Sequence, residues 1–204
     1  MEIIGNRIRI KPIKLDDVYE MKNWGYHKNT LLFDYNLPEL TDDELRQWYK
    51  YKTRGFNRIY YSVFNEVNIL IGYLGIKNIR RILREATLGI VLDPNYVNMG
   101  YGTEIILNYL DYFFNNMNMK TMYLEVAKFN KRAIKCYEKS GFTIIDMYLD
   151  RFFDQNLNLE DPYYLKEKSS FVIEKGKIYN YIYMMKIDKK TYLKEREKLN
   201  DRKY

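Results

Sequence analysis

Apolar and polar residues alternate with the period of a β-strand near the start of the chain. Residues 7–13 show this alternation, which predicts a half-buried strand, and Asp16 or Asp17 can then cap a helix that runs to about Trp24. Thr41 and Glu44 have capping-box spacing and predict the start of a second helix. Apolar segments with polar turns between them then predict an antiparallel meander at residues 59–64, 69–76 and 85–92.

A helix is expected directly after the meander. Following an Asp93-Pro94 turn and two closely spaced glycines, apolar residues recur every three or four positions at Ile106, Tyr109, Leu110 and Phe113. This spacing places them on one face, which we expect to pack against the sheet.

The last third of the chain predicts strands connected by one further helix. Residues 122–126 predict a strand, and Asn130 can cap a helix that ends at Ser140, with Gly141 as its left-handed stop. A strand at 142–149 is expected to pair with a terminal strand at 178–187. The order of elements predicts the mixed α/β class. We expect one domain over residues 1–204, with an insertion at about 151–177 and a helical tail from about 188.

Composition supports a globular protein. Of the 204 residues 47% are hydrophobic and 17% are aromatic, and no linker-like segment divides the chain. There is no run of about 18 apolar residues, and the first residues lack the order of charge and hydrophobicity found in a signal peptide. A soluble, cytoplasmic protein is therefore expected, without a membrane partner.

Charge and the rare residue types narrow the possible chemistry. The net charge of +7 suits an anionic cofactor, ribosomal material or nucleic acid, but the basic residues are scattered, so direct nucleic-acid binding is not expected. Cys136 is the single cysteine and forms no internal disulfide, and packing in a helix explains it. With His27 as the single histidine, the chain offers too few nitrogen and sulfur ligands for a zinc site, and no metal is expected.

The segment Asn98-Met99-Gly100-Tyr101-Gly102-Thr103 has the character of a phosphate-binding turn. Its glycines allow close approach of the backbone to a ligand, and the following helix N-terminus attracts negative charge. A tight turn before a helix is the alternative explanation. A Rossmann fingerprint would need a small residue in place of Ile105, and a P-loop would need lysine in place of Thr103.

The chain resembles the GCN5-related N-acetyltransferase (GNAT) superfamily through two segments in the expected order and separation. The first is Leu88-Gly89-Ile90-Val91-Leu92-Asp93-Pro94 followed by residues 98–103, and the second is Leu124-Glu125-Val126 followed by residues 130–142. The resemblance is tightest over about residues 85–148. It implies a central, mostly antiparallel twisted sheet flanked by helices, and acetyl-CoA as cosubstrate. Family members carry Gln or Arg three positions before the first motif glycine, where this chain has Val97.

The resemblance also implies which residues bind the cofactor. The pyrophosphate would bind backbone amides of the glycine turn, and the pantetheine arm would pair with the exposed strand and hydrogen-bond Asn130, which can also be a helix cap. The implied cofactor-binding residues are Ile90, Val91, Leu92, Asn98, Met99, Gly100, Tyr101, Gly102, Thr103, Asn130 and Ala133.

Two side chains are candidates for the proton transfers. Similar enzymes use a tyrosine at the position of Tyr137 to protonate the departing thiolate, and a phenol suits this role because it is protonated at neutral pH. Packing is the alternative, since the chain has 22 tyrosines. Glu125 matches the base of the ribosomal-protein N-terminal acetyltransferases (the RimI, RimJ and RimL branch), with an exposed strand glutamate as the alternative. Glu85 is the reserve base, and His27 is read as a surface or packing residue.

These features predict an enzyme that transfers acetyl from acetyl-CoA to a primary amine, on a peptide N-terminus or a small molecule, as a monomer or homodimer. A non-catalytic CoA-binding module of the same fold is the main alternative, and an RNA-associated basic protein is a third possibility. For the acceptor wall, the insertion from Arg151 to Tyr164 and the aromatic residues Trp24, Tyr26 and Tyr35 are candidates, although packing explains each of them equally well.

Overall fold

The fold is built on one sheet, seen in a computed structural model that describes residues 1–201, without the side chains of 195 and 198–201. The strand order is β1-β2-β3-β4-β5-β6-β9-β7, with β8 paired to β9, and all neighbours are antiparallel except β5 and β6. The strands are β1 Ile3–Ile4, β2 Ile8–Pro12, β3 Ile59–Asn65, β4 Leu70–Arg80, β5 Glu85–Leu92, β6 Thr121–Ala127, β7 Thr143–Arg151, β8 Phe171–Glu174 and β9 Lys177–Asp188. The helices are α1 Leu15–Glu20, α2 Asp42–Thr53, α3 Tyr101–Asp111, α4 Lys131–Lys139, α5 Pro162–Glu167 and α6 Lys189–Asp201. This confirms the mixed α/β class and the meander.

The first two helices begin with local capping interactions. At α2 the predicted capping box is present, because Thr41 Oγ1 accepts from the Glu44 amide at 3.3 Å and the Glu44 carboxylate accepts from the Thr41 amide at 2.8 Å. At α1 the prediction is shifted: the cap position is Lys14, and Asp17 accepts from the Lys14 amide at 2.8 Å from inside the first turn. The helix therefore begins earlier than a cap at Asp16 or Asp17 would place it.

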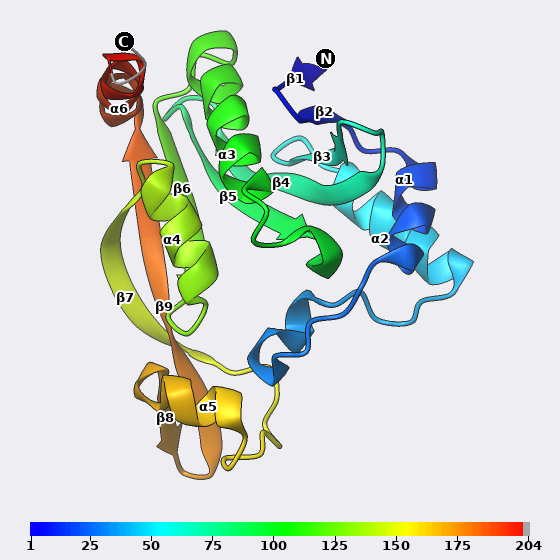
Figure 1. Cartoon of the computed structure of the whole chain (residues 1–204), viewed down its shortest axis with the longest axis vertical. Helices are drawn as coiled ribbons and strands as arrows, with labels where there is room; N and C mark the ends of the chain where they lie inside the picture. The colour runs from blue at the N-terminus through cyan, green and yellow to red at the C-terminus, as the bar shows by residue number, and fades with distance from the viewer. Residues whose placement is uncertain (202–204) are drawn as a thin grey trace.

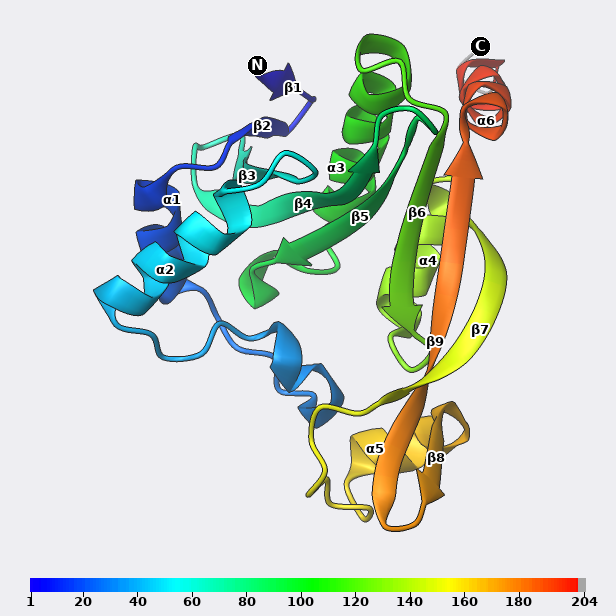
Figure 2. The ribbon, with the colours of Figure 1, turned by 180° about the vertical axis from the view of Figure 1, so that it is seen from behind.

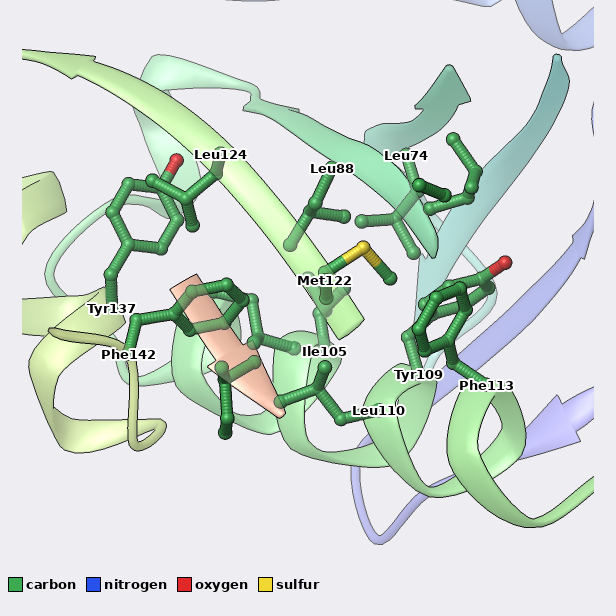
Figure 3. Packing of buried hydrophobic residues seen from close by; sticks show 14 of the residues in the cluster. Leu74, Leu88, Ile105, Tyr109, Leu110, Phe113, Met122, Leu124, Tyr137 and Phe142 are labelled. Atoms are coloured by element: carbon green, nitrogen blue, oxygen red, sulfur yellow. The ribbon is translucent and has the colours of Figure 1, made fainter. Parts of the chain in front are cut away.

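Helices cover the two faces of the sheet (Figures 1 and 2). On one face α3 and α4 bury the main core, in which Leu74, Leu88 and Met122 from the strands meet Ile105 and Phe113 (Figure 3). On the opposite face α1 and α2 pack on the other side chains of β3 and β4 in a second cluster of buried residues. Because side chains alternate along a strand, residues of β4 and β5 divide between the two faces.

The two parallel strands of the sheet separate along their length. Pairing of β5 with β6 is confined to Glu85–Thr87 against Thr121–Tyr123, although β5 continues to Leu92 and β6 to Ala127. Figure 2 shows the two strands diverging from this end. Beyond residue 87, the edge of β5 that faces β6 is free of strand partners among the described residues, and this leaves backbone groups available to a ligand.

The C-terminal part adds strands on the far side of β6. The terminal strand β9 pairs with β7, as expected, and also with β6, so it lies between them. Residues 151–177 hold α5 and β8 and extend the β7–β9 end of the sheet, where Phe152, Tyr164 and Phe171 pack with Leu31 and Leu32. The segment from about 188 forms α6. Within the described part of the chain, no helix is both long and apolar enough to cross a bilayer.

Candidate active site

A cavity of about 600 Å³ occupies the region where β5 and β6 diverge. Its walls come from β5, the glycine turn, α3 and α4 on one face, and from β4 and α2 on the other. The cavity therefore passes between the strands and reaches both faces of the sheet. Eleven of the thirteen residues predicted to bind the cofactor or to act in proton transfer line this cavity, although they lie on elements separated along the chain. They are Ile90, Val91, Leu92, Asn98, Gly100, Gly102, Thr103, Glu125, Asn130, Ala133 and Tyr137.

The glycine turn at the start of α3 has the backbone geometry of an anion site. Asn98 and Gly100 have positive φ angles of 64° and 85°, and Gly100 occupies the helix cap without a side-chain hydrogen bond to the first turn. The first amides of a helix have no partners within the helix, and they carry the positive end of its dipole. Because no side chain caps them, the amides at Gly102 and Thr103 are free to bind an anion in the cavity.

Arg7 holds the turn from the side away from the cavity. Its Nη1 donates to the Met99 carbonyl at 3.1 Å, its Nε pairs with Glu104 at 3.0 Å, and its guanidinium lies 4.6 Å from the centre of the Tyr101 ring. Neither Met99 nor Tyr101 lines the cavity, and the Tyr101 ring packs under Arg7, so these two residues can serve the turn through their backbone. No sequence signal singled out Arg7, because it lies 92 residues from Met99.

Close packing of α3 on α4 requires Gly102. A Cβ at this position would lie 3.1 Å from Cys136 Sγ and 3.6 Å from Leu92 Cδ1. Burial raises the pKa of the Cys136 thiol, which also contacts the Thr103 hydroxyl at 3.4 Å. Cys136 is a residue of α4, as its interpretation from the sequence expected, and it packs against the turn while also lining the cavity.

Asn130 shows the capping geometry that the sequence predicted. Its Oδ1 accepts from the Ala133 amide at 3.2 Å, while the residue is buried and lines the cavity. The oxygen serves α4, and the amide nitrogen carries two hydrogens, so it can donate both to the neighbouring Tyr35 hydroxyl and to a ligand. On the cavity side of α4, the cations Arg132, Lys135 and Lys139 form a stripe.

Tyr137 lies on α4 between the core and the cavity. It is 7% exposed, its ring packs edge-on against Phe142 with centroids 6.1 Å apart, and Figure 3 shows its hydroxyl on the side away from Phe142. Burial raises the pKa of Tyr137 well above its ordinary value, so the phenol stays protonated. No hydrogen bond occupies its hydroxyl within residues 1–201, which leaves it available as a donor.

Glu125 lies on β6 and faces the opposite side of the sheet from Leu124 and Val126. Those two side chains are buried, whereas Glu125 is exposed to the cavity. The Tyr148 hydroxyl on β7 donates to Glu125 Oε1 at 3.0 Å, and burial together with Glu125 raises the pKa of Tyr148 to about 12. Tyr148 was not identified from the sequence, since only the pairing of β7 and β6 with β9 brings it to Glu125.

Glu85 and His27, the other two ionisable residues considered from the sequence, differ in their position relative to the cavity. Glu85 forms an ion pair with Arg80 at the start of β5 and does not line the cavity. His27 does line it, beside Tyr35, and burial and Arg132 lower the pKa of its imidazole. The interpretation of His27 as a surface or packing residue overlooked this position.

The predicted acceptor wall is only partly present at the cavity. Tyr35 lines it, but Trp24 is buried beside Tyr73, with ring centroids 6.2 Å apart, and Tyr26 is exposed elsewhere. Residues 151–164 do not reach the cavity, because Phe152 is buried against Phe129 and Phe171. In their place the acceptor side of the cavity is lined by a surface that we call the β4 wall, made of Lys52 from α2, Tyr60 from β3, and Tyr73 and Lys77 from β4.

Comparison with known proteins agrees with this arrangement. Residues 7–143 match the model of the acetyltransferase (GNAT) domain family. The chain is 25% identical over 150 residues to spermidine N(1)-acetyltransferase of Vibrio cholerae, covering 74% of this chain and 87% of that protein. It is 32% identical over 82 residues to the Escherichia coli K12 protein of the same name, covering 40% and 44%. The crystal structure of the Vibrio cholerae enzyme with CoA and spermine has a TM-score of 0.68 at 22% identity, covering 91% of this chain and 98% of that one.

The chain belongs to the GNAT family of acetyltransferases. The family match spans the meander, the glycine turn and α4, which are the elements that build the cavity. The protein is thus an acetyl-CoA-dependent N-acetyltransferase. These comparisons do not single out the ribosomal-protein branch suggested by the position of Glu125, because the relatives reported above are named for spermidine.

Proposed function

We propose that the protein transfers the acetyl group of acetyl-CoA to a primary amine on a small molecule, by direct attack in a ternary complex. The observation that carries this proposal is the passage between β5 and β6. The glycine turn and α4 line it on one face of the sheet, and Glu125 and the β4 wall line it on the other. Two substrates can therefore meet from opposite faces.

The cofactor is assigned to the face that carries α3 and α4. Its pyrophosphate suits the open amides at residues 100–103, and the stripe of Arg132, Lys135 and Lys139 supplies positive charge for further phosphate oxygens. The pantetheine amides suit the unpaired edge of β5 at residues 90–92 and the Asn130 amide.

The chemistry requires two proton transfers. A neutral amine attacks the thioester carbonyl carbon, a C–N bond forms, and the C–S bond breaks to release a thiolate. The Tyr137 hydroxyl gives its proton to that sulfur. The proton lost by the attacking nitrogen passes to the Glu125 carboxylate, directly or through water. The Tyr148 hydroxyl holds Glu125 in position from β7.

The acceptor is assigned to small molecules on two grounds. Relatives over most of the chain are named for spermidine, a small amine. The side chains of Lys52, Tyr60 and Tyr73 also line the cavity on the acceptor side, which suits a small acceptor. A protein N-terminus, the other acceptor class considered from the sequence, would have to enter past them.

An acetyl-CoA consumption screen tests the proposal. Peptides, polyamines, aminoglycosides and amino acids would be offered in parallel, with thiol release as the readout and calorimetric titration of acetyl-CoA as a separate measure of cofactor binding. We expect release that depends on a small amine. Tight acetyl-CoA binding without transfer to any amine would contradict the proposal and favour the non-catalytic CoA-binding module.

A further inference from the structure

The acceptor side of the cavity carries positive charge that the proposed reaction does not use. Lys52 from α2 and Lys77 from β4 both line it. Neither ammonium has a carboxylate within ion-pair distance among the residues that the structure describes. Lys52 instead lies over aromatic rings, with its Nζ 5.2 Å from the centre of Trp48 and 5.3 Å from that of Tyr60.

Two glycines lie next to Tyr60 and Lys77 where β5 has separated from β6. Gly75 on β4 is paired with Gly89 on β5, within the stretch of β5 that has separated from β6. A Cβ at Gly75 would meet the ring of Tyr60, and a Cβ at Gly89 would lie 3.6 Å from both Cε and Nζ of Lys77. The absence of a side chain at Gly75 thus makes room for the Tyr60 ring, and the Lys77 ammonium lies within van der Waals reach of Gly89.

The charged side chains of the β4 wall are both cations. Burial, Lys77 and Arg58 all lower the pKa of Lys52, which means that these cations repel one another without a compensating anion. Glu125 is the one carboxylate among the described residues that line the cavity. Asp34 acts on the pKa of Tyr35 and of Tyr73 but does not line it.

A polyamine does not match such a wall. Each of its ammonium groups beyond the reacting nitrogen would meet Lys52 or Lys77, and like charges disfavour binding. An amine that also carries a carboxylate or phosphate would present the missing anion to both lysines, while its amine reaches Glu125.

We propose that the acceptor is a small primary amine bearing an anionic group, which Lys77 and Lys52 bind on the β4 wall. This inference rests on the acetyl transfer proposed above and specifies its acceptor. It departs from spermidine, for which the relatives are named, because the β4 wall selects for negative charge.

Matched acceptors test the inference. Ethanolamine would be compared with O-phosphoethanolamine, propylamine with β-alanine, and glucosamine with glucosamine 6-phosphate, with spermidine alongside. We expect kcat/KM to be about tenfold or more higher for the anionic member of each accepted pair, since charge-assisted hydrogen bonds to two ammonium groups are added. The phosphate and carboxylate pairs show which anion is preferred.

A charge reversal shows whether the lysines cause the preference. Lys77→Glu should remove the preference for the anionic acceptor and raise kcat/KM for spermidine, with the acetyl-CoA affinity unchanged. Lys50→Glu is the control, because Lys50 is an exposed residue of the same helix as Lys52 and does not line the cavity. It should leave the preference intact, and thermal melting checks that both variants fold.

The outcomes separate the two proposals. Transfer to spermidine, or to the amines without an anionic group, that is at least as fast as transfer to the anionic amines would overturn the acceptor class and leave acetyl transfer standing. A preference that survives Lys77→Glu would overturn the assignment to the β4 wall. Acetyl-CoA binding without transfer to any of these amines would contradict the proposed function, and the acceptor class with it.

Discussion

Tyr137 is the single residue on which the proposed acid step depends. Its ring is buried while its hydroxyl is free of protein hydrogen bonds among the described residues, and burial keeps its pKa above the ordinary value. We expect Tyr137→Phe to lower kcat by about 10²- to 10⁴-fold, the usual contribution of a general acid, with acetyl-CoA affinity retained. Since the phenol stays protonated through the alkaline range, the loss should be similar at all assay pH values.

Steady-state kinetics over a pH series and calorimetric titration of acetyl-CoA measure these effects. Tyr109→Phe is the matched control, because Tyr109 is another buried tyrosine of the main core and does not line the cavity. Unchanged turnover in Tyr137→Phe would remove the residue from the catalytic assignment and leave packing as its role.

Glu125 and Tyr148 have different roles in the proposed base step, and substitutions can separate them. Glu125→Gln removes the proposed proton acceptor, so we expect a loss of kcat of about 10²-fold or more. Tyr148→Phe removes only the hydrogen bond that holds the carboxylate, so a loss of several-fold is expected. Kinetics with one acceptor measure both. An unchanged kcat in Glu125→Gln would contradict its role as the proton acceptor and leave water in that role.

At the scale of elements, the turn between β5 and α3 is the segment to which we assign the cofactor pyrophosphate. Gly100 has a φ of 85°, and a Cβ there would lie 3.3 Å from Arg7 Nη2. We expect Gly100→Val to weaken acetyl-CoA binding at least tenfold by strain and by obstruction of the open amides, a change of about 1.4 kcal/mol. Calorimetric titration of the folded variant measures it.

Gly176 provides the control for backbone strain. It also has a positive φ, 72°, but lies in the β8–β9 turn with no atom within 4 Å of a built Cβ. Gly176→Val should lower the melting temperature through the same strain and leave acetyl-CoA affinity unchanged. Normal affinity in Gly100→Val would contradict the placement of the pyrophosphate at this turn.

At the scale of the whole molecule, cofactor binding should stabilise the fold. Ligand bound only by the native state at 100 times its Kd adds about 2.7 kcal/mol, which corresponds to about 5–10 °C for a chain of this size. Thermal melting with and without acetyl-CoA measures the shift. Tyr137→Phe should retain the shift and Gly100→Val should lose about half of it or more, whereas an equal shift in both would contradict the separation of chemistry from binding.

Local signals determined most of the elements. The capping box at Thr41, the Asn130 cap and the positive φ of Gly141 depend on neighbours a few residues apart, so each could be predicted from the sequence. The short strand β1 and the start of α1 at Leu15 were missed. A two-residue strand has no periodicity, and Asp17 bonds the cap position from within the helix rather than from before it.

The sequence by itself determined the order of the longer strands and helices outside residues 151–177, the glycine turn, and the family resemblance that names Tyr137 and Glu125. Only the tertiary structure decided that β5 separates from β6, that Arg7 supports the turn, that Tyr148 donates to Glu125, and that Lys52 and Lys77 line the cavity. The physical reason is the separation along the chain of the residues that interact. Capping and periodicity act between residues close in the chain, whereas a cavity wall is made by strand pairing and by charges from elements far apart in it.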